Sequence, residues 1–365
     1  MFGFLDDLGP EKVLHVARPA LGLKAIVVVD NTAAGPAIGG TRMAKDVTVE
    51  ECFRLARAMT LKNAAAGLAH GGAKSVIVGD PSMPAAEKEQ TIRAFARSLR
   101  DLSDYIPGPD MGTNEQAMAW IKDEIGRSVG LPRVIGGIPL DEIGATGFGL
   151  AVAAEAAEAH GGPRIAGARV VVQGFGAVGQ HAARFLAAKG AVLVAASDSH
   201  AAVADPAGLD IEALIALKRS GGSFAECSNG QKMGRDEVVG VACDIWIPAA
   251  RPDVLNAQNI GKLQAKLLLQ GANIPATLEA EQILHSRGVL SIPDFIANAG
   301  GVICASVEYH GGTEKAAFDT IAEKIAANTH EVLTSAKADR LLPRDAAVRL
   351  AERRIRSAMA LRRWR

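Results

Sequence analysis

Apolar and polar residues alternate along this chain in two rhythms, one typical of buried strands and one typical of amphipathic helices. The first 140 residues show both rhythms in turn. They predict a strand at 23–30, a helix at 49–66, a strand at 74–79 and a helix at 85–102. Thr48-Val-Glu-Glu51 reads as the capping box of the first of these helices.

A segment rich in glycine and proline, residues 130–139, predicts a domain boundary. Beyond it, helical patterns are predicted at 149–159, 177–189, 313–336 and 345–361, and strands at 169–173, 192–198, 245–247, 266–269 and 289–292. Several of these strands end in polar or turn residues. Ligands bind outside such carboxyl ends in doubly wound sheets, so the second half of the chain predicts a ligand site.

Length and composition favour an α/β fold with two domains. The chain has 365 residues, 48% apolar and 4% aromatic, with 39 glycines, which suits helices packed closely on largely parallel sheets. Forty basic and forty acidic side chains give a formal net charge of zero. The long-range field of a nucleic-acid binder is therefore missing, and we expect a small-molecule partner.

The four cysteines lack the spacing of a zinc site or a disulfide framework, so we expect no metal and a reducing compartment. The first residues lack a basic segment followed by an apolar core, and no uncharged apolar stretch approaches membrane-spanning length. We therefore expect a cytoplasmic protein that does not bind membranes.

A dinucleotide-binding motif follows the strand at 169–173. Gly174, Gly176 and Gly179 form the pattern GxGxxG, with Phe175, Ala177 and Val178 between them, and Asp198 ends the next strand. The motif predicts pyrophosphate binding at the start of the following helix. Asp198 is expected to accept hydrogen bonds from the adenosine ribose and to repel a 2′-phosphate, which favours NAD over NADP. The alternative is a tight turn between strand and helix without a ligand.

Two lysines and an aspartate are the candidate chemical groups of the first half. Lys62 falls on the apolar stripe of its predicted helix, and Lys74 opens a strand after a glycine-rich loop. Asp110 follows a Pro-Gly-Pro segment. A lysine removed from water needs an anionic partner, and each of two convergent lysines lowers the pKa of the other.

Several candidate residues along the chain also have plainer interpretations. Lys62 could extend along the helix end to reach water, Asp110 could cap a helix, and Asn298 could make a turn between strand and helix. His70, beside the glycine-rich loop, is interpreted as structural or solvated rather than as a base.

Five motifs resemble those of the glutamate, leucine, phenylalanine and valine dehydrogenases, in the same order along the chain. They are Gly35-Pro-Ala-Ile-Gly-Gly-Thr-Arg-Met43, Met59-Thr-Leu-Lys-Asn-Ala-Ala-Ala-Gly67, Gly71-Gly-Ala-Lys74, Asp110-Met-Gly-Thr-Asn114 and Asn298-Ala-Gly-Gly-Val302. The resemblance implies oxidative deamination of an L-amino acid to its 2-oxo acid and ammonia. It further implies that Lys62 holds the α-carboxylate, Lys74 is the catalytic lysine and Asp110 shuttles protons.

The same resemblance places further residues near the ligands. Asn273 and Thr146 are expected near the cofactor, and Asn298 beside the substrate or the nicotinamide. Gly39, Gly40 and Val302 are expected in the substrate site. The family also implies an N-terminal substrate, catalytic and oligomerisation domain at 1–140, completed by a C-terminal helix at 340–365. A Rossmann-type domain at 141–339, separated by a cleft, and a homo-oligomer complete this expectation.

The side-chain pocket favours an apolar substrate. In glutamate-specific members, a lysine precedes the Gly-Gly pair and a serine follows the last motif, whereas this chain has Ile38 and Ala305. A glutamate carboxylate would be unpaired there, which costs several kcal/mol. Gly108 leaves further room, so leucine, valine, isoleucine and phenylalanine are all expected candidates. The pocket is therefore most similar to leucine and phenylalanine dehydrogenases. The alternatives are a glutamate dehydrogenase and a dinucleotide-sensing protein without catalysis.

Overall fold

The computed structural model describes residues 2–363. It divides into two compact units, here called unit 1 (Met1–Ile143, Val302–Thr320, Val348–Arg365) and unit 2 (Gly144–Gly301, Ile321–Ala347). Residues 364 and 365 of the helix expected at 340–365 lie outside the described part of the chain. The expected domain limits at 140 and 340 stay predictions.

Unit 1 contains a five-stranded mixed sheet in the order β1-β2-β4-β3-β5. Its strands are β1 (Lys12–Arg18), β2 (Leu23–Asn31), β3 (Ala37–Ala44), β4 (Gly72–Val78) and β5 (Tyr105–Pro109). The first two strand pairings of this order, β1 with β2 and β2 with β4, are antiparallel. Strand β3 runs parallel to both β4 and β5, so the carboxyl ends of these three strands meet at one edge of the sheet.

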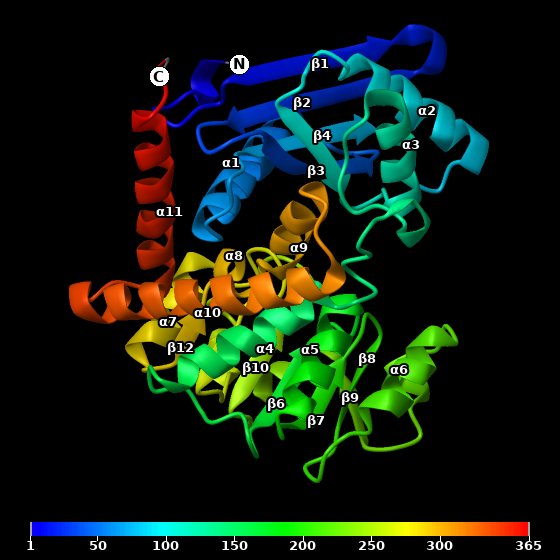
Figure 1. Cartoon of the computed structure of the whole chain (residues 1–365). Helices are drawn as coiled ribbons and strands as arrows, with labels where there is room; N and C mark the ends of the chain where they lie inside the picture. The colour runs from blue at the N-terminus through cyan, green and yellow to red at the C-terminus, as the bar shows by residue number, and fades with distance from the viewer. Residues whose placement is uncertain (1, 364–365) are drawn as a thin grey trace. The chain divides into compact units, whose positions relative to one another are not determined.

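Helices cover both faces of this sheet, because its strands carry apolar side chains on both sides (Figure 1). Helix α1 (Val49–Ala65) packs Cys52, Phe53 and Ala56 against one face. Helices α2 (Ala85–Ser98) and α3 (Glu115–Ile125) cover the other, with Phe95 and Met118 fully buried. The short 3-10 helices of unit 1 are Phe2–Phe4, Pro19–Leu21 and Arg133–Ile135.

Strands β3 and β5 were not predicted, because glycine and proline interrupt their apolar pattern. A Cβ on Gly39 would lie 1.7 Å from the carbonyl oxygen of Ala73, so the close approach of β3 to β4 requires glycine there. Strand β5 contains Pro107 and Pro109 and lies at the edge of the sheet, where a missing N–H is tolerated.

Unit 2 is built on a seven-stranded sheet in the order β12-β11-β10-β6-β7-β8-β9. Its strands are β6 (Arg169–Gln173), β7 (Val192–Ser197), β8 (Ala201–Ala204), β9 (Gln231–Gly234), β10 (Ile245–Pro248), β11 (Leu267–Leu269) and β12 (Leu290–Ile292). Five of them, β12 to β7 in this order, are parallel, and β8 and β9 are antiparallel additions. This Rossmann-like sheet and the two-unit α/β architecture confirm the predicted fold class.

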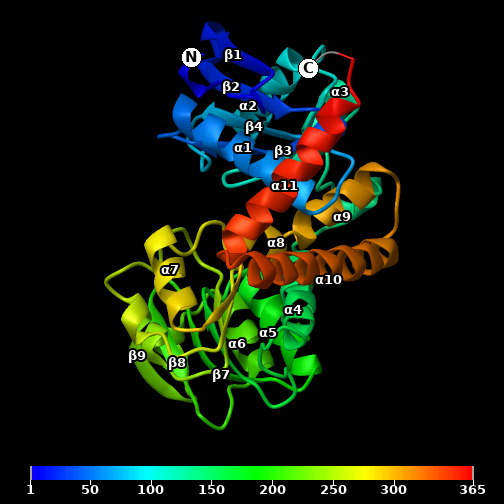
Figure 2. The same cartoon turned by 90° about the vertical axis from the view of Figure 1, so that its left-hand side faces the viewer.

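The chain changes direction in this sheet between β6 and β10, which lie side by side although β7, β8 and β9 separate them in the sequence. Such a switch point is the usual ligand site of a doubly wound sheet. Helices α4 (Ala145–Glu158) and α5 (Ala177–Ala188) lie against each other in both views (Figures 1 and 2).

Helix α4 begins four residues before the predicted start at 149. A Cβ on Gly147 would lie 2.6 Å from both the Ala182 nitrogen and His181 Cβ, so close packing against α5 requires glycine in this helix. That packing overrides the weak helix propensity of glycine.

The remaining helices are α6 (Ile211–Arg219), α7 (Leu278–Ser286), α8 (Asp294–Ala297), α9 (Gly300–Tyr309), α10 (Glu314–Asp339) and α11 (Pro343–Ala360), with 3-10 helices at Phe224–Glu226, Arg235–Gly240 and Ile260–Lys262. Of these, α10 and α11 lie close to the helices predicted at 313–336 and 345–361, whereas α6, α7, α8 and α9 were not predicted. Over residues 2–363, none of the helices combines the length and the apolar character needed to cross a bilayer.

Candidate active site

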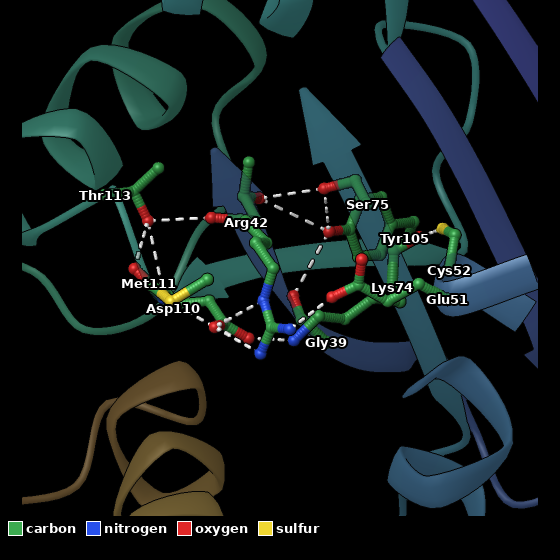
Figure 3. A network of polar contacts seen from close by, with 11 residues as sticks. Gly39, Arg42, Glu51, Cys52, Lys74, Ser75, Tyr105, Asp110, Met111 and Thr113 are labelled. Carbon is green, nitrogen blue, oxygen red and sulfur yellow. Dashed lines mark hydrogen bonds and ion pairs between the residues drawn. The ribbon is translucent and has the colours of Figure 1, made fainter. Parts of the chain in front are cut away.

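Lys74 and Asp110 meet at the edge where β4 and β5 flank β3 (Figure 3). Lys74 lies on β4 with a side chain only 4% exposed, and its Nζ donates to Oδ2 of Asp110, the residue that follows β5. A Cβ on Gly40 would lie 2.8 Å from that Oδ2 and 3.1 Å from that Nζ. Glycine at position 40 therefore leaves room for the pair.

The other oxygen of Asp110 is held by different groups. Its Oδ1 accepts hydrogen bonds from Arg42 Nη2 at 3.2 Å, from Arg42 Nε at 3.3 Å and from the Met111 N–H at 2.5 Å. The N-cap of α3 is Asn114, whose side chain accepts from the Ala117 N–H. Asp110 therefore does not cap this helix, and its carboxylate faces Lys74 and Arg42.

Burial and neighbouring cations lower the pKa of Lys74 to about 7. Desolvation is the largest cause, and the positive charges of Arg42 and Lys62 add to it. The Asp110 carboxylate opposes these effects because it stabilises the ammonium form. A lysine in this range can exchange protons near neutral pH.

Lys62 lies in the last turn of α1 and is half-buried. Its charge reaches Lys74 electrostatically, as expected for two lysines brought together by a helix end and a strand start. The predicted capping box of α1 is only half present. The Thr48 hydroxyl accepts from the Glu51 N–H at 3.1 Å, but the Glu51 carboxylate turns to Arg42 Nη1 at 2.5 Å.

An apolar cluster contains the two predicted pocket residues Ile38 and Ala305, together with Ile106 and Val129. All four are buried. Ile106 is the direct neighbour of Ile38 across strands β3 and β5. A Cβ on Gly108 would lie 3.2 Å from Val129 Cγ2, so Val129 limits the space beside Gly108.

Sequence reasoning missed Ile106, Val129 and Arg42. Ile106 precedes Gly108 by two residues and therefore shares its face of β5, a signal that alternation along a strand could have provided. Val129 lies in the loop after α3, just before the glycine- and proline-rich segment 130–139, and its approach to β5 has no local signal. Val302, another expected pocket residue, is half-buried near the start of α9.

His70 is buried, which agrees with a structural interpretation. Its Nδ1 lies 3.0 Å from the Pro36 carbonyl oxygen, and burial lowers the pKa of the imidazole. A neutral ring at this position supports the loop that leads into β4.

The glycine-rich motif of unit 2 lies at the switch point between β6 and β10. Gly174 has φ of 92°, and a Cβ there would lie 2.8 Å from the backbone of Ala249 and Ala250. Gly176 is the N-cap of α5, without a side-chain cap, and a Cβ there would meet nothing within 4 Å. Open space beside uncapped N–H groups fits a bound phosphate.

The remaining motif residues shape this helix start. Phe175 is buried against Phe224, with ring centroids 5.4 Å apart, and Ala177 and Val178 begin the first turn of α5. A Cβ on Gly179 would lie 2.1 Å from the Gly174 carbonyl oxygen, so the turn requires glycine there as well.

Hydrogen bonds within the protein engage both carboxylate oxygens of Asp198. Its Oδ1 accepts from the N–H groups of His200 at 2.8 Å and Ala201 at 3.1 Å, and its Oδ2 accepts from Lys218 Nζ at 2.8 Å and the Phe224 N–H at 2.9 Å. Four donors occupy the four acceptor positions of the carboxylate. Ribose binding by Asp198 stays a prediction, and it would require one of these hydrogen bonds to be shared or replaced.

Asn273 and Asn298, two of the residues expected near the ligands, lie together after the end of β11. Asn298 Nδ2 donates to the carbonyl oxygen of Gly271 at 3.2 Å and to Asn273 Oδ1 at 3.1 Å. A Cβ on Gly300 would lie 3.2 Å from Thr146 Cα. Asn298 Oδ1 is buried and has no hydrogen-bond partner within residues 2–363. A buried acceptor without a partner fits a ligand that brings an amide donor.

Models of one protein family match almost the whole chain. The model described as "Glu/Leu/Phe/Val dehydrogenase, dimerisation domain" matches residues 10–127, and "Glutamate/Leucine/Phenylalanine/Valine dehydrogenase" matches residues 136–363.

Individual relatives agree with the family models. The chain is 38% identical over 357 residues to a glutamate dehydrogenase of Aeropyrum pernix, covering 92% of this chain and 85% of the relative. It is 39% identical over 293 residues to an NADP-specific glutamate dehydrogenase of Saccharolobus shibatae, covering 76% and 69%. It resembles the hetero-hexameric glutamate dehydrogenase of Thermus thermophilus in its Leu-bound form, with a TM-score of 0.87, 30% identity and coverage of 96% and 90%.

The activities in the names of these relatives bear on two of the expectations from the sequence. They give no support to the expected leucine or phenylalanine specificity and favour the glutamate alternative. They also leave the expected choice of NAD over NADP unsupported, because one relative is NADP-specific. The reaction class and the use of a nicotinamide cofactor are common to the family, and the non-catalytic alternative is set aside. The chain belongs to the glutamate, leucine, phenylalanine and valine dehydrogenase family and is an oxidoreductase acting on the CH–NH2 group of amino acids.

Proposed function

We propose that this protein reversibly deaminates an L-amino acid to its 2-oxo acid and ammonia, with Lys74 and Asp110 as the reacting pair. The observation that carries the proposal is the buried contact between the Lys74 ammonium and Asp110 Oδ2. A base and an acid of opposite charge, held together away from water, are what proton transfer during deamination requires.

Lys62 and Lys74 have different roles in this proposal. The Lys62 ammonium pairs with the substrate α-carboxylate and fixes the orientation of the Cα–H bond. Once the substrate Cα has given up its hydride, neutral Lys74 takes a proton from the water that attacks this carbon, which becomes the 2-oxo carbon, and the low pKa of Lys74 supports this role. Asp110 Oδ2 carries protons to and from the departing nitrogen.

A nicotinamide cofactor would accept the hydride from the substrate Cα. The residues of unit 2 suit such a group: the amides that open α5 would hold its pyrophosphate, and the Asn298 Oδ1 atom would accept from its carboxamide. NAD was the expected cofactor, and the Lys218 ammonium that pairs with Asp198 weakens the argument against NADP. The NADP-specific relative supports testing both.

Glutamate is the candidate substrate that the relatives support. Two relatives that the chain matches over most of its length are named glutamate dehydrogenases, and so is a similar solved structure. Under this candidate, the γ-carboxylate would need a cation or several N–H donors at the end of the pocket.

An apolar amino acid is the candidate that the pocket supports. Ile38, Ile106, Val129 and Ala305 pack together in a buried apolar cluster. An aliphatic or aromatic side chain gains free energy in such surroundings, whereas an unpaired carboxylate loses several kcal/mol. Leucine, valine, isoleucine and phenylalanine are the members of this class to test.

A substrate screen tests both levels of the proposal. Formation of NADH and NADPH would be followed with glutamate, leucine, valine, isoleucine and phenylalanine, and the reverse reaction with each 2-oxo acid and ammonia. Turnover that disappears in Lys74→Ala supports the reaction. The ratio of kcat/KM for glutamate and leucine decides the substrate, and an absence of turnover with every pair would overturn the proposed function.

We also propose a homo-oligomer. The match to a dimerisation-domain model over residues 10–127 and the likeness to a hexameric enzyme support this inference. Light scattering coupled to size-exclusion chromatography tests it, and a mass of one chain would contradict it.

A further inference from the structure

The Arg42 guanidinium on β3 bridges two carboxylates beside the proposed reacting pair (Figure 3). Its Nη1 donates to Glu51 Oε1 at 2.5 Å, and its Nε and Nη2 donate to Asp110 Oδ1 at 3.3 and 3.2 Å. The Arg42 side chain is only 20% exposed. A guanidinium that uses three of its nitrogens in this way is fixed in orientation.

The two oxygens of Asp110 consequently have different surroundings. Oδ1 accepts from Arg42 and from the Met111 N–H, whereas Oδ2 accepts from Lys74. Without Arg42, Oδ1 would keep only the Met111 N–H as a donor, so the plane of the carboxylate and the direction of Oδ2 toward Lys74 would be less strongly fixed.

We propose that Arg42 is a positioning residue, which holds Asp110 Oδ1 so that Oδ2 alone serves the proton transfer beside Lys74. This inference rests on the roles proposed above for Lys74 and Asp110. Arg42 acts through Asp110 and through its charge, and it has no direct contact with the reacting atoms in this scheme.

Glu51 supports this arrangement from the start of α1. At the third helical position its side chain could have closed a capping box, yet it reaches Arg42 instead, and the Thr48 hydroxyl caps the helix alone. The Glu51 carboxylate gives Arg42 a second anion, so the guanidinium is fixed at both ends. Its charge is also part of the electrostatic surroundings of Lys74.

The charges that face Lys74 act in opposite directions. Arg42 and Lys62 lower its pKa, whereas Glu51 raises it, and the Asp110 carboxylate stabilises the ammonium form. Cys52 faces Lys74 as well, but burial raises the pKa of this thiol to about 12, so it is uncharged near neutrality. Removing the Arg42 charge should therefore raise the pKa of Lys74, and removing the Glu51 charge should lower it.

The experiment measures kcat, KM and the pH profile of kcat/KM for wild type, Arg42→Gln, Arg42→Lys and Glu51→Gln. In Arg42→Gln we expect kcat to fall by about 10²-fold, with KM changed by less than about threefold. The acidic limb of the profile should move up by about one pH unit. Arg42→Lys keeps the charge but lacks the fork geometry, so its limb should stay in place while kcat still falls. In Glu51→Gln the limb should move to lower pH.

Arg57 provides a matched control. It lies on α1 with a side chain 25% exposed, and it also bridges two carboxylates, those of Asp6 and Asp30. Arg57→Gln should lower thermal stability and leave both kcat and the acidic limb unchanged. This variant separates the loss of a half-buried arginine in general from the loss of Arg42.

Three results would overturn the proposal: an unmoved limb in Arg42→Gln, identical profiles for Arg42→Gln and Arg42→Lys, or equal effects of Arg42→Gln and Arg57→Gln. If Arg42→Gln does not fold, Glu51→Gln decides, and a limb that stays in place or moves to higher pH counts against the proposal. Failure of the proposed function looks different, because wild type would then lack turnover or Lys74→Ala would retain it.

Discussion

Lys218 Nζ donates to Asp198 Oδ2 at 2.8 Å. Asp198 follows the second strand of the dinucleotide-binding motif, and this ion pair lies inside the protein. The Asp198 side chain is only 4% exposed. Burial alone would raise its pKa, but the hydrogen bonds from Lys218 and from three backbone N–H groups outweigh burial and lower the pKa to about 2. The residue is therefore part of the framework around β7 and α6.

We predict that Asp198→Asn destabilises the protein without changing cofactor choice. An asparagine presents an NH2 group where donors already point, and it loses the ion pair, at a cost of about 2–4 kcal/mol. Urea denaturation at pH 7 measures the loss, and the ratio of kcat/KM for NAD and NADP should change by less than about threefold. A shift toward NADP at unchanged stability would show that Asp198 does contact the ribose.

The same carboxylate gives a pH dependence with a defined sign. The folded-state pKa of Asp198 lies below its ordinary value of 3.8, so its contribution to stability is complete above that value. The contribution is lost as the pH falls toward about 2. Wild type should therefore lose more stability than Asp198→Asn between pH 5 and pH 3, as measured by urea midpoints. Parallel midpoints in the two proteins would contradict the assignment.

Two glycines of the cofactor loop should respond differently to alanine. At Gly174 the φ of 92° and the backbone 2.8 Å from a Cβ make alanine strained, so we expect a loss of about 1–3 kcal/mol in stability. At Gly176 a Cβ meets nothing, so Gly176→Ala should fold normally and bind NAD or NADP at least about tenfold more weakly. Thermal unfolding and calorimetric titration separate the two effects. Normal cofactor binding by Gly176→Ala would mean that no phosphate approaches there.

The sequence predicted the elements whose signals are local. The βαβ unit from β6 to β7 was placed within one residue at each end, because an apolar strand, a glycine motif and an amphipathic helix follow each other without interruption. Lys74 and Asp110 could also be chosen, since each stands in a motif that the family shares.

Contacts between distant segments could not be predicted in this way. The pairing of Asp198 with Lys218 depends on the path of α6, and the approach of Val129 to Gly108 depends on the path of the loop after α3. For Glu51, the predicted helix start was correct, but the predicted hydrogen-bond partner of its side chain was wrong. The capping-box motif was present, but Arg42 on the neighbouring strand offers a charged partner that the helix terminus cannot match.

The pKa of Lys74 predicts the pH profile of deamination. Because this pKa is lowered to about 7, neutral lysine predominates above pH 7, and its fraction falls tenfold for each pH unit below that value. The kcat/KM for deamination should therefore fall with slope one below about pH 7. Lys74→Ala should lose about 10²–10⁴-fold in kcat while the affinity for the cofactor stays within about twofold of wild type. An activity plateau that extends to pH 5 would show that Lys74 does not act as the base.

Ile38→Lys tests what the side-chain pocket recognises. The new ammonium would enter the cluster of Ile106, Val129 and Ala305, where it lacks an anion unless the substrate brings one. If the native substrate is apolar, the substitution should raise the ratio of kcat/KM for glutamate over leucine by about 10²-fold, and most of the change should appear in KM. If the protein already uses glutamate, its γ-carboxylate is bound by other groups, and the added lysine should lower or barely change that ratio.

Ile38→Met is the matched control, because it keeps an apolar side chain of similar volume and should leave the ratio within about threefold. Circular dichroism and thermal unfolding of both variants show whether the buried lysine is tolerated, and the ratio is interpreted only for folded protein. The two outcomes for Ile38→Lys exclude each other, so one substitution decides between the substrate that the relatives favour and the one that the pocket favours.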